Sequence, residues 1–159
     1  MMRNEKAELL KQQIREAFVD VPYPNQDNSV DPYCSECVDC DKAFKGKHWL
    51  DITMAEVNIT YSACLWHFGM EEYLFYLPAY LLLSIDFNDD ARWDIAQSLT
   101  IYFDVTSERY IEYLKSFNSA KRKVVINYFE FIAEEHNEND FDDKEYVALI
   151  DSLRRFWAE

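Results

Sequence analysis

The chain has 159 residues, of which 49% are hydrophobic and 16% aromatic, which is enough apolar material for the core of one domain spanning residues 1–159. Disorder is thereby excluded, and with only two glycines the chain has no Gly-rich phosphate loop, dinucleotide-binding fingerprint or Gly-x-Ser-x-Gly turn. The 30 acidic residues outnumber the 16 Lys and Arg residues, so the net charge is −14 and nucleic acid is a poor partner.

Apolar residues recur with helical spacing along almost the whole chain. The spacing predicts a first helix from Asn4 to Val19. Three prolines and a run of turn-forming residues predict a long loop over residues 21–33. Residues 34–44 are a candidate short helix, which Gly46 would close in a left-handed cap.

Thr53 and Glu56 have the spacing of a capping box, the motif that starts many helices. They predict an apolar helix that begins here and ends at Phe68. The next helix is predicted over residues 71–87, kinked or broken at Pro78, and its apolar stretch is too short to span a bilayer. Further helices are expected over residues 89–102, 107–117, 120–136 and 143–157. The pattern predicts an all-α fold, a compact bundle or short stack of six to seven helices, with a long proline-containing loop after the first helix.

The N-terminal residues lack the apolar region of a secretion signal. We therefore expect a cytoplasmic protein whose four cysteines are reduced thiols, with no membrane partner.

The cysteines are the sharpest chemical feature of the sequence. The spacing of the first three suits a zinc ion, which a histidine would complete, although no glycine turns the backbone between them. The alternative is that they are buried thiols, and a redox role is disfavoured because the chain lacks a βαβ pattern. Candidate metal ligands are Cys34, Cys37, Cys40, Cys64, His48 and His67. Sequence alone assigns no metal, no cofactor and no catalytic residue.

Four short motifs also stand out: Cys34-x-Glu36-Cys37, Phe44-x-Gly46-Lys47-x-Trp49, Tyr76-Leu77-Pro78-Ala79-Tyr80 and Phe156-Trp157. Together they resemble an uncharacterised family of small bacterial helical domains, over most of the chain. The resemblance implies a bacterial, single-domain, all-helical protein, and it carries no activity with it.

The most acidic stretch of the chain, residues 130–151, has nine acidic residues and one lysine. A small acidic protein rich in Tyr and Trp is suited to bind a basic protein. We therefore expect a non-enzymatic, immunity-type protein that neutralises a basic toxin, such as a nuclease, by covering its active surface. The predicted steering patch consists of Glu134, Glu135, Glu138, Asp140, Asp142 and Asp143.

Two other functions remain open. One is a metal-binding (zinc) or regulatory helical domain that uses Cys34 and Cys37. The other is an enzyme whose site no recognised motif marks. The sequence leaves the oligomeric state and the role of the loop over residues 21–33 undetermined.

Overall fold

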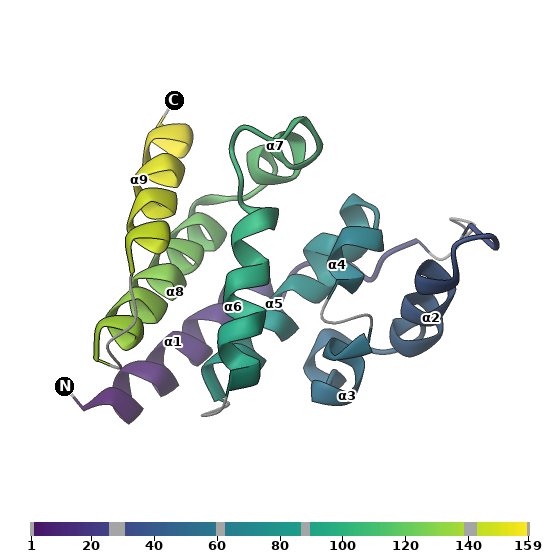
Figure 1. The fold of residues 1–159 in the computed structure, drawn as a ribbon, viewed down its shortest axis with the longest axis horizontal. Coiled ribbons are helices and arrows are strands. Elements are labelled where there is room, and N and C mark those ends of the chain that lie inside the picture. Colours follow the sequence, from purple (N-terminus) through teal and green to yellow (C-terminus); the bar gives the residue numbers. More distant parts are fainter. Residues whose placement is uncertain (1, 26–30, 60–62, 87–89, 139–142, 159) are drawn as a thin grey trace. The chain divides into compact units, whose positions relative to one another are not determined.

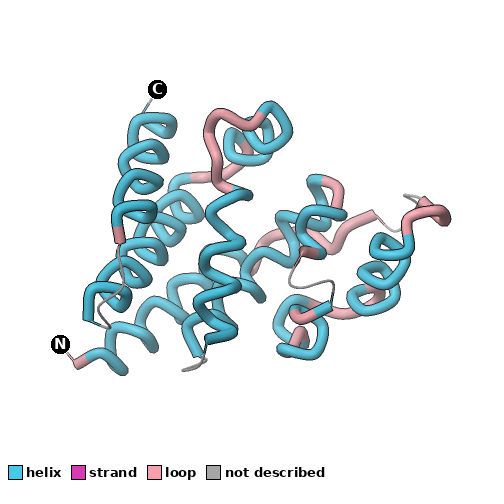
Figure 2. Tube along the Cα trace, in the orientation of Figure 1, coloured by secondary structure: helices cyan, strands magenta, loops and turns pink. Residues whose placement is uncertain are grey.

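The computed structural model describes residues 2–25, 31–59, 63–86, 90–138 and 143–158. Within these ranges every regular element is a helix, and the remainder is loop or turn (Figure 2). The predicted all-α class is confirmed. The described ranges hold nine α-helices and one 3-10 helix, which is more than the six to seven helices predicted.

The additional helices come mainly from the first half of the chain. In chain order, the elements are α1 (Arg3–Phe18), α2 (Ser35–Phe44), the 3-10 helix η1 (Trp49–Asp51), α3 (Met54–Val57), α4 (Cys64–His67), α5 (Met70–Asp86), α6 (Asp90–Tyr102), α7 (Glu108–Lys115), α8 (Ser119–Glu138) and α9 (Lys144–Ala158) (Figure 1). The single helix predicted from Thr53 to Phe68 is wrong, because α3 and α4 are separate short helices. Helix α5, by contrast, continues through Pro78.

By its contacts the chain divides into two compact units. We call residues 20–98 the central unit, and residues 1–19 with 99–159 the terminal unit. The prediction of a single domain stays a prediction. Among the described residues, no helix is both long enough and apolar enough to cross a membrane.

The terminal unit is organised around α8, which contacts both α1 and α9 (Figure 1). Buried side chains at helical spacing fill the space between these helices, as expected for amphipathic helices that share one core. They include Leu10, Ile14 and Phe18 of α1, Tyr128, Phe129 and Ile132 of α8, and Tyr146, Ile150 and Leu153 of α9. Near the C-terminus, the Trp157 ring stacks on Phe117 at 5.9 Å, and its Nε1–H donates to the Leu114 carbonyl at 2.9 Å.

The central unit has an aromatic core where α2 and α5 meet the end of α4. The rings of Phe44, Phe68 and Tyr76 lie with centroids 4.9–5.5 Å apart. All three side chains are buried. Such aromatic clusters bury a large apolar area with defined ring geometry, so they fix the positions of these helices.

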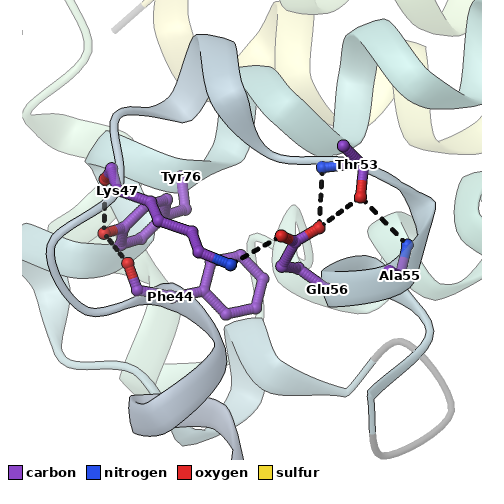
Figure 3. A network of polar contacts seen from close by, with 6 residues as sticks. All are labelled: Phe44, Lys47, Thr53, Ala55, Glu56 and Tyr76. Atoms are coloured by element: carbon purple, nitrogen blue, oxygen red, sulfur yellow. Dashed lines mark hydrogen bonds and ion pairs between the residues drawn. The ribbon is translucent and has the colours of Figure 1, made fainter.

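The connection after α2 is held by the polar contacts shown in Figure 3. Gly46 has a φ of 79°, so the predicted left-handed cap is confirmed. The buried Tyr76 hydroxyl lies 2.8 Å from the Phe44 carbonyl oxygen and 2.9 Å from that of Lys47. Burial raises the pKa of Tyr76. The hydroxyl therefore remains protonated and donates to these backbone oxygens, of which that of Phe44 also accepts from the Lys47 N–H at 3.1 Å.

The predicted capping box is also confirmed. The Thr53 side chain accepts from the Ala55 N–H at 3.3 Å, and the Glu56 carboxylate accepts from the Thr53 N–H at 2.9 Å (Figure 3). The Lys47 ammonium lies 2.7 Å from the same carboxylate. Burial alone would raise the pKa of Glu56, but the hydrogen bonds from Lys47 and Thr53 outweigh it and lower the pKa to about 2.

Candidate thiol and histidine site

A candidate site lies at the N-terminal end of α2. Cys34 is the N-cap residue of this helix, and its Sγ accepts a hydrogen bond from the Cys37 N–H at 3.2 Å. The cysteine thus occupies the place where Ser, Thr or Asp usually satisfies the first free N–H groups of a helix. Both sulfurs lie where the helix dipole favours negative charge.

Helix α4 supplies the third group of the site. Its last residue is His67, whose Nδ1 lies 3.3 Å from the Cys37 Sγ. The two sulfurs and one ring nitrogen of His67 all lie within 4.8 Å of one another. Among the described residues, this is the group of His, Cys, Asp and Glu side chains that is placed to hold a metal ion.

The other ring nitrogen of His67 is held by Glu36. Its Nε2 lies 2.9 Å from the Glu36 carboxylate. Because a carboxylate accepts hydrogen bonds, the neutral imidazole carries its proton on Nε2, and the Nδ1 lone pair is directed at the sulfur. Carboxylates orient many metal-binding histidines in this way.

A disulfide holds the two helices together. All four cysteines lie in the described ranges and all are paired, Cys34 with Cys37 and Cys40 with Cys64. The expectation of four reduced thiols is wrong for this structure, because it rested on the lack of a secretion signal rather than on which cysteines the fold brings together. Spacing explains the arrangement: Cys37 lies three residues before Cys40, and His67 three residues after Cys64. One bridge between α2 and α4 therefore places His67 beside Cys37 on the adjoining helical turn.

The two disulfides differ in exposure. Cys40 and Cys64 are 1% and 0% exposed. Cys34, Cys37 and His67 are of intermediate exposure, and the Glu36 side chain is 61% exposed. A metal ion or small molecule therefore reaches the first pair without unfolding the core.

The remaining candidate ligand takes no part in this site. His48 caps η1, where its Nδ1 accepts from the Leu50 N–H at 3.0 Å. Sequence reasoning named both cysteines and His67 as candidates, but it missed Glu36 as their neighbour. The sequence signal for the site is that Cys37 and Cys40 in α2 have the same three-residue spacing as Cys64 and His67 in α4. This spacing becomes informative only when the two helices are known to contact each other.

Of the six residues in the predicted acidic patch, the structure describes the side chains of Glu134, Glu135 and Asp143. Glu134 is exposed and lies 2.8 Å from the Lys6 ammonium. Glu135 is 5% exposed and pairs with Arg3 at 2.5 Å, so its carboxylate faces Arg3 rather than solvent. Asp143 is half-buried. The side chain of Glu138, together with Asp140 and Asp142, lies outside the described residues.

The fold and the site define an all-helical protein with a half-exposed centre of two sulfurs and one imidazole. The chain belongs to the family of unknown function DUF6714, whose model matches residues 5–159. This confirms the resemblance to an uncharacterised family, whose bacterial origin stays a prediction. No curated protein and no solved structure matches the chain.

Proposed function

We propose that this protein is a metal-binding regulatory domain, and that its reduced form binds one transition-metal ion through Cys34, Cys37 and His67. The observation that carries the proposal is the convergence of these three donor atoms within 4.8 Å. The carboxylate of Glu36 on the far side of the imidazole supports it, because it directs the Nδ1 lone pair toward the sulfurs.

The distances suit a tetrahedral ion. With Zn–S near 2.3 Å and Zn–N near 2.05 Å, a sulfur and a nitrogen of one tetrahedron lie about 3.6 Å apart. The Cys37 Sγ and His67 Nδ1 are 3.3 Å apart. The two sulfurs must separate to about 3.8 Å after reduction, which side-chain rotation of the half-exposed Cys34 allows.

The donor set favours zinc among the common ions. Two thiolates and an imidazole are soft to borderline ligands, which select zinc over magnesium or calcium. Three protein ligands leave a fourth position for water or for a donor from another molecule. We infer that a partner or effector is sensed at this fourth position.

Isothermal titration of the full-length chain with Zn²⁺ tests the proposal, with Cys34 and Cys37 reduced and the buried Cys40–Cys64 disulfide retained. We expect one ion per chain, and loss of binding in His67→Ala and in Cys34→Ser. Glu36→Gln should weaken the affinity about 10–100-fold, as is typical when a residue that orients a ligand is changed. The matched controls are His48→Ala and Asp39→Asn, the latter an exposed acid of the same helix. A reduced chain that binds no zinc, with its thiols confirmed by alkylation, would contradict the proposal.

A second candidate is the immunity-type protein that binds and neutralises a basic toxin. The observation that favours it is the net charge of −14, since acidic surfaces speed association with basic proteins. The patch proposed for steering is Glu134, Glu138, Asp140, Asp142 and Asp143. Glu135 is left out because its side chain is only 5% exposed, whereas that of Glu134 is 50% exposed.

Association kinetics test this second candidate. The partner is first isolated from the native organism at low salt and identified. Changing the five patch residues to Gln or Asn should then slow association about tenfold or more, without changing the helical circular dichroism. An unchanged association rate would exclude the patch. The matched control neutralises five exposed acids elsewhere: Glu16, Asp39, Asp51, Asp94 and Glu108.

A further inference from the structure

We propose that Cys34 and Cys37 form a redox-active disulfide that exchanges with external thiols, with Cys34 as the attacking sulfur and His67 as the proton carrier for Cys37. This activity goes beyond metal binding and does not depend on it. The two roles use the same sulfurs, so a chain in the disulfide form does not hold the metal.

The position of Cys34 and Cys37 at the start of α2 favours thiol exchange. Cys34 caps α2 and Cys37 lies in its first turn, so both sulfurs are near the free N–H groups of the helix. The Cys37 N–H already donates to the Cys34 Sγ at 3.2 Å. Thiolates are stabilised at helix N-termini and in Cys-x-x-Cys pairs, and the thiolate is the reactive form in disulfide exchange.

The imidazole of His67 lies beside Cys37 and also favours thiol exchange. The His67 Nδ1 lies 3.3 Å from the Cys37 Sγ, within reach of its proton. Glu36 holds the Nε2 side at 2.9 Å, which keeps the Nδ1 side of the ring directed at the Cys37 sulfur. No such group is needed if the disulfide serves only to hold the chain together.

The two disulfides differ in their exposure to solvent. Cys40 and Cys64 are fully buried, whereas Cys34 and Cys37 are half-exposed. Tyr33, which precedes the pair, is 96% exposed. A thiol in solution therefore reaches the first disulfide and not the second.

The reaction balances with thiols as the reductant. A thiol RSH gives its proton to the His67 Nδ1 as its sulfur attacks the Cys34 Sγ, the bond between the two protein sulfurs breaks, and Cys37 leaves as a thiolate that receives this proton from Nδ1. A second thiolate attacks the RS sulfur of the mixed disulfide, which releases RSSR and the Cys34 thiolate. Two electrons pass from two thiols to the cysteine pair. In the reverse direction the Cys34 thiolate attacks RSSR, and Cys37 resolves the mixed disulfide after His67 takes up its proton.

The first test compares the two disulfides in the intact, metal-free chain. The protein is incubated with reduced glutathione or with reduced thioredoxin, in the presence of a chelator, and newly formed thiols are alkylated and located by mass spectrometry. We expect Cys34 and Cys37 to be labelled at least about tenfold faster than Cys40 and Cys64. Faster reaction with glutathione assigns a small-molecule thiol, and faster reaction with thioredoxin assigns a protein dithiol. Equal labelling of both pairs, or of neither, overturns the proposal.

The second test separates the roles of the residues. With oxidised glutathione, reduced Cys37→Ser should accumulate a mixed disulfide on Cys34, whereas Cys34→Ser should accumulate little on Cys37. His67→Gln should slow the resolving step about 100-fold and leave the first attack unchanged, because only resolution needs the proton of Cys37. His48→Gln is the control. Each variant keeps the buried disulfide, and circular dichroism verifies its fold.

These results remain distinct from those of the metal titration. A chain that binds zinc and shows equal labelling of both disulfides retains the proposed function and loses this inference. A chain that binds no zinc but traps glutathione on Cys34 loses the proposed metal-binding function and retains the redox inference. If Cys37→Ser traps no mixed disulfide although it is folded and reduced, the assignment of Cys34 as the attacking sulfur is overturned.

Discussion

The disulfide between Cys40 and Cys64 should stabilise the central unit by closing a long loop. The two residues are 24 apart in the sequence. Cross-linking a loop of this length lowers the entropy of the unfolded chain by an amount equivalent to about 3.4 kcal/mol at 25 °C. Replacing both residues with Ala should therefore lower the free energy of unfolding by about 3–4 kcal/mol. The lost packing of the two buried sulfurs adds to this loss.

Urea unfolding, followed by tryptophan fluorescence, measures this loss. Three of the four tryptophans, Trp49, Trp66 and Trp93, belong to the central unit, so the signal reports mainly on it. The matched control replaces Cys34 and Cys37 with Ala. Their three-residue separation predicts a loss of only about 1.6 kcal/mol. Both experiments use metal-free buffer, so that bound metal does not contribute.

The same double variant should also weaken the site. If the Cys40–Cys64 bridge holds α4 against α2, its loss frees His67 from Cys37 and lowers zinc affinity, although no ligand is changed. A free energy of unfolding within 1 kcal/mol of the unmodified chain, with zinc affinity also unchanged, would refute the reasoning.

Further substitutions test the contacts around the two cores. Glu56→Gln should cost about 1.5–3 kcal/mol, because a charge-assisted network is lost. The pKa of Glu56 is lowered to about 2, so the stabilisation by its carboxylate is present above the unfolded pKa of 4.5 and is lost as the pH falls from 4.5 toward 2. Urea unfolding across that pH range measures this loss. A Glu56→Gln chain with the same pH dependence of stability would contradict the assignment. Tyr76→Phe should cost about 1–3 kcal/mol, since the Lys47 carbonyl loses the hydroxyl donor while that of Phe44 keeps the Lys47 N–H, and an unchanged melting temperature would argue against that contact. Arg3→Ala should cost about 1.5–3 kcal/mol, because the buried Glu135 loses a charge-assisted hydrogen bond from a half-exposed cation. The exposed Arg15→Ala on the same helix should cost less than about 0.5 kcal/mol, and equal losses would show that the pair is unimportant.

Much of the fold follows from local signals in the sequence. Helical spacing of apolar residues predicts α1, α8 and α9, because each must bury one face. Helix α5 is buried on most of its surface, and its nearly continuous apolar stretch predicts it. Gly46 and the Thr53 capping box predicted their local structures for equally local reasons.

The prediction of one helix from Thr53 to Phe68 is wrong because apolar periodicity carries no information on the intrinsic helix preference of each residue. The stretch from Asn58 to Ser62 contains no strong helix former, which is the signal for a break between α3 and α4. Pro78 shows the converse. The helix containing it continues, because the buried apolar side chains on either side stabilise it more than the lost hydrogen bond costs.

The candidate site was predicted only as a set of possible ligands. Nothing in the local sequence shows that α2 pairs with α4, since that contact joins residues about 30 positions apart. Tertiary contact alone distinguishes His67, which reaches the sulfurs, from His48, which caps a 3-10 helix. The same limit applies to Glu135, which a charge count treats as exposed although it is buried beside Arg3.

The central claim is that two sulfurs and one imidazole bind a single metal ion. X-ray absorption spectroscopy of the reduced, zinc-loaded chain tests it most directly. We expect two sulfur ligands at about 2.3 Å and a histidine nitrogen at about 2.0–2.1 Å, with loss of the nitrogen in His67→Ala. Zinc surrounded only by oxygen and nitrogen, or a reduced chain that retains no zinc, would contradict it.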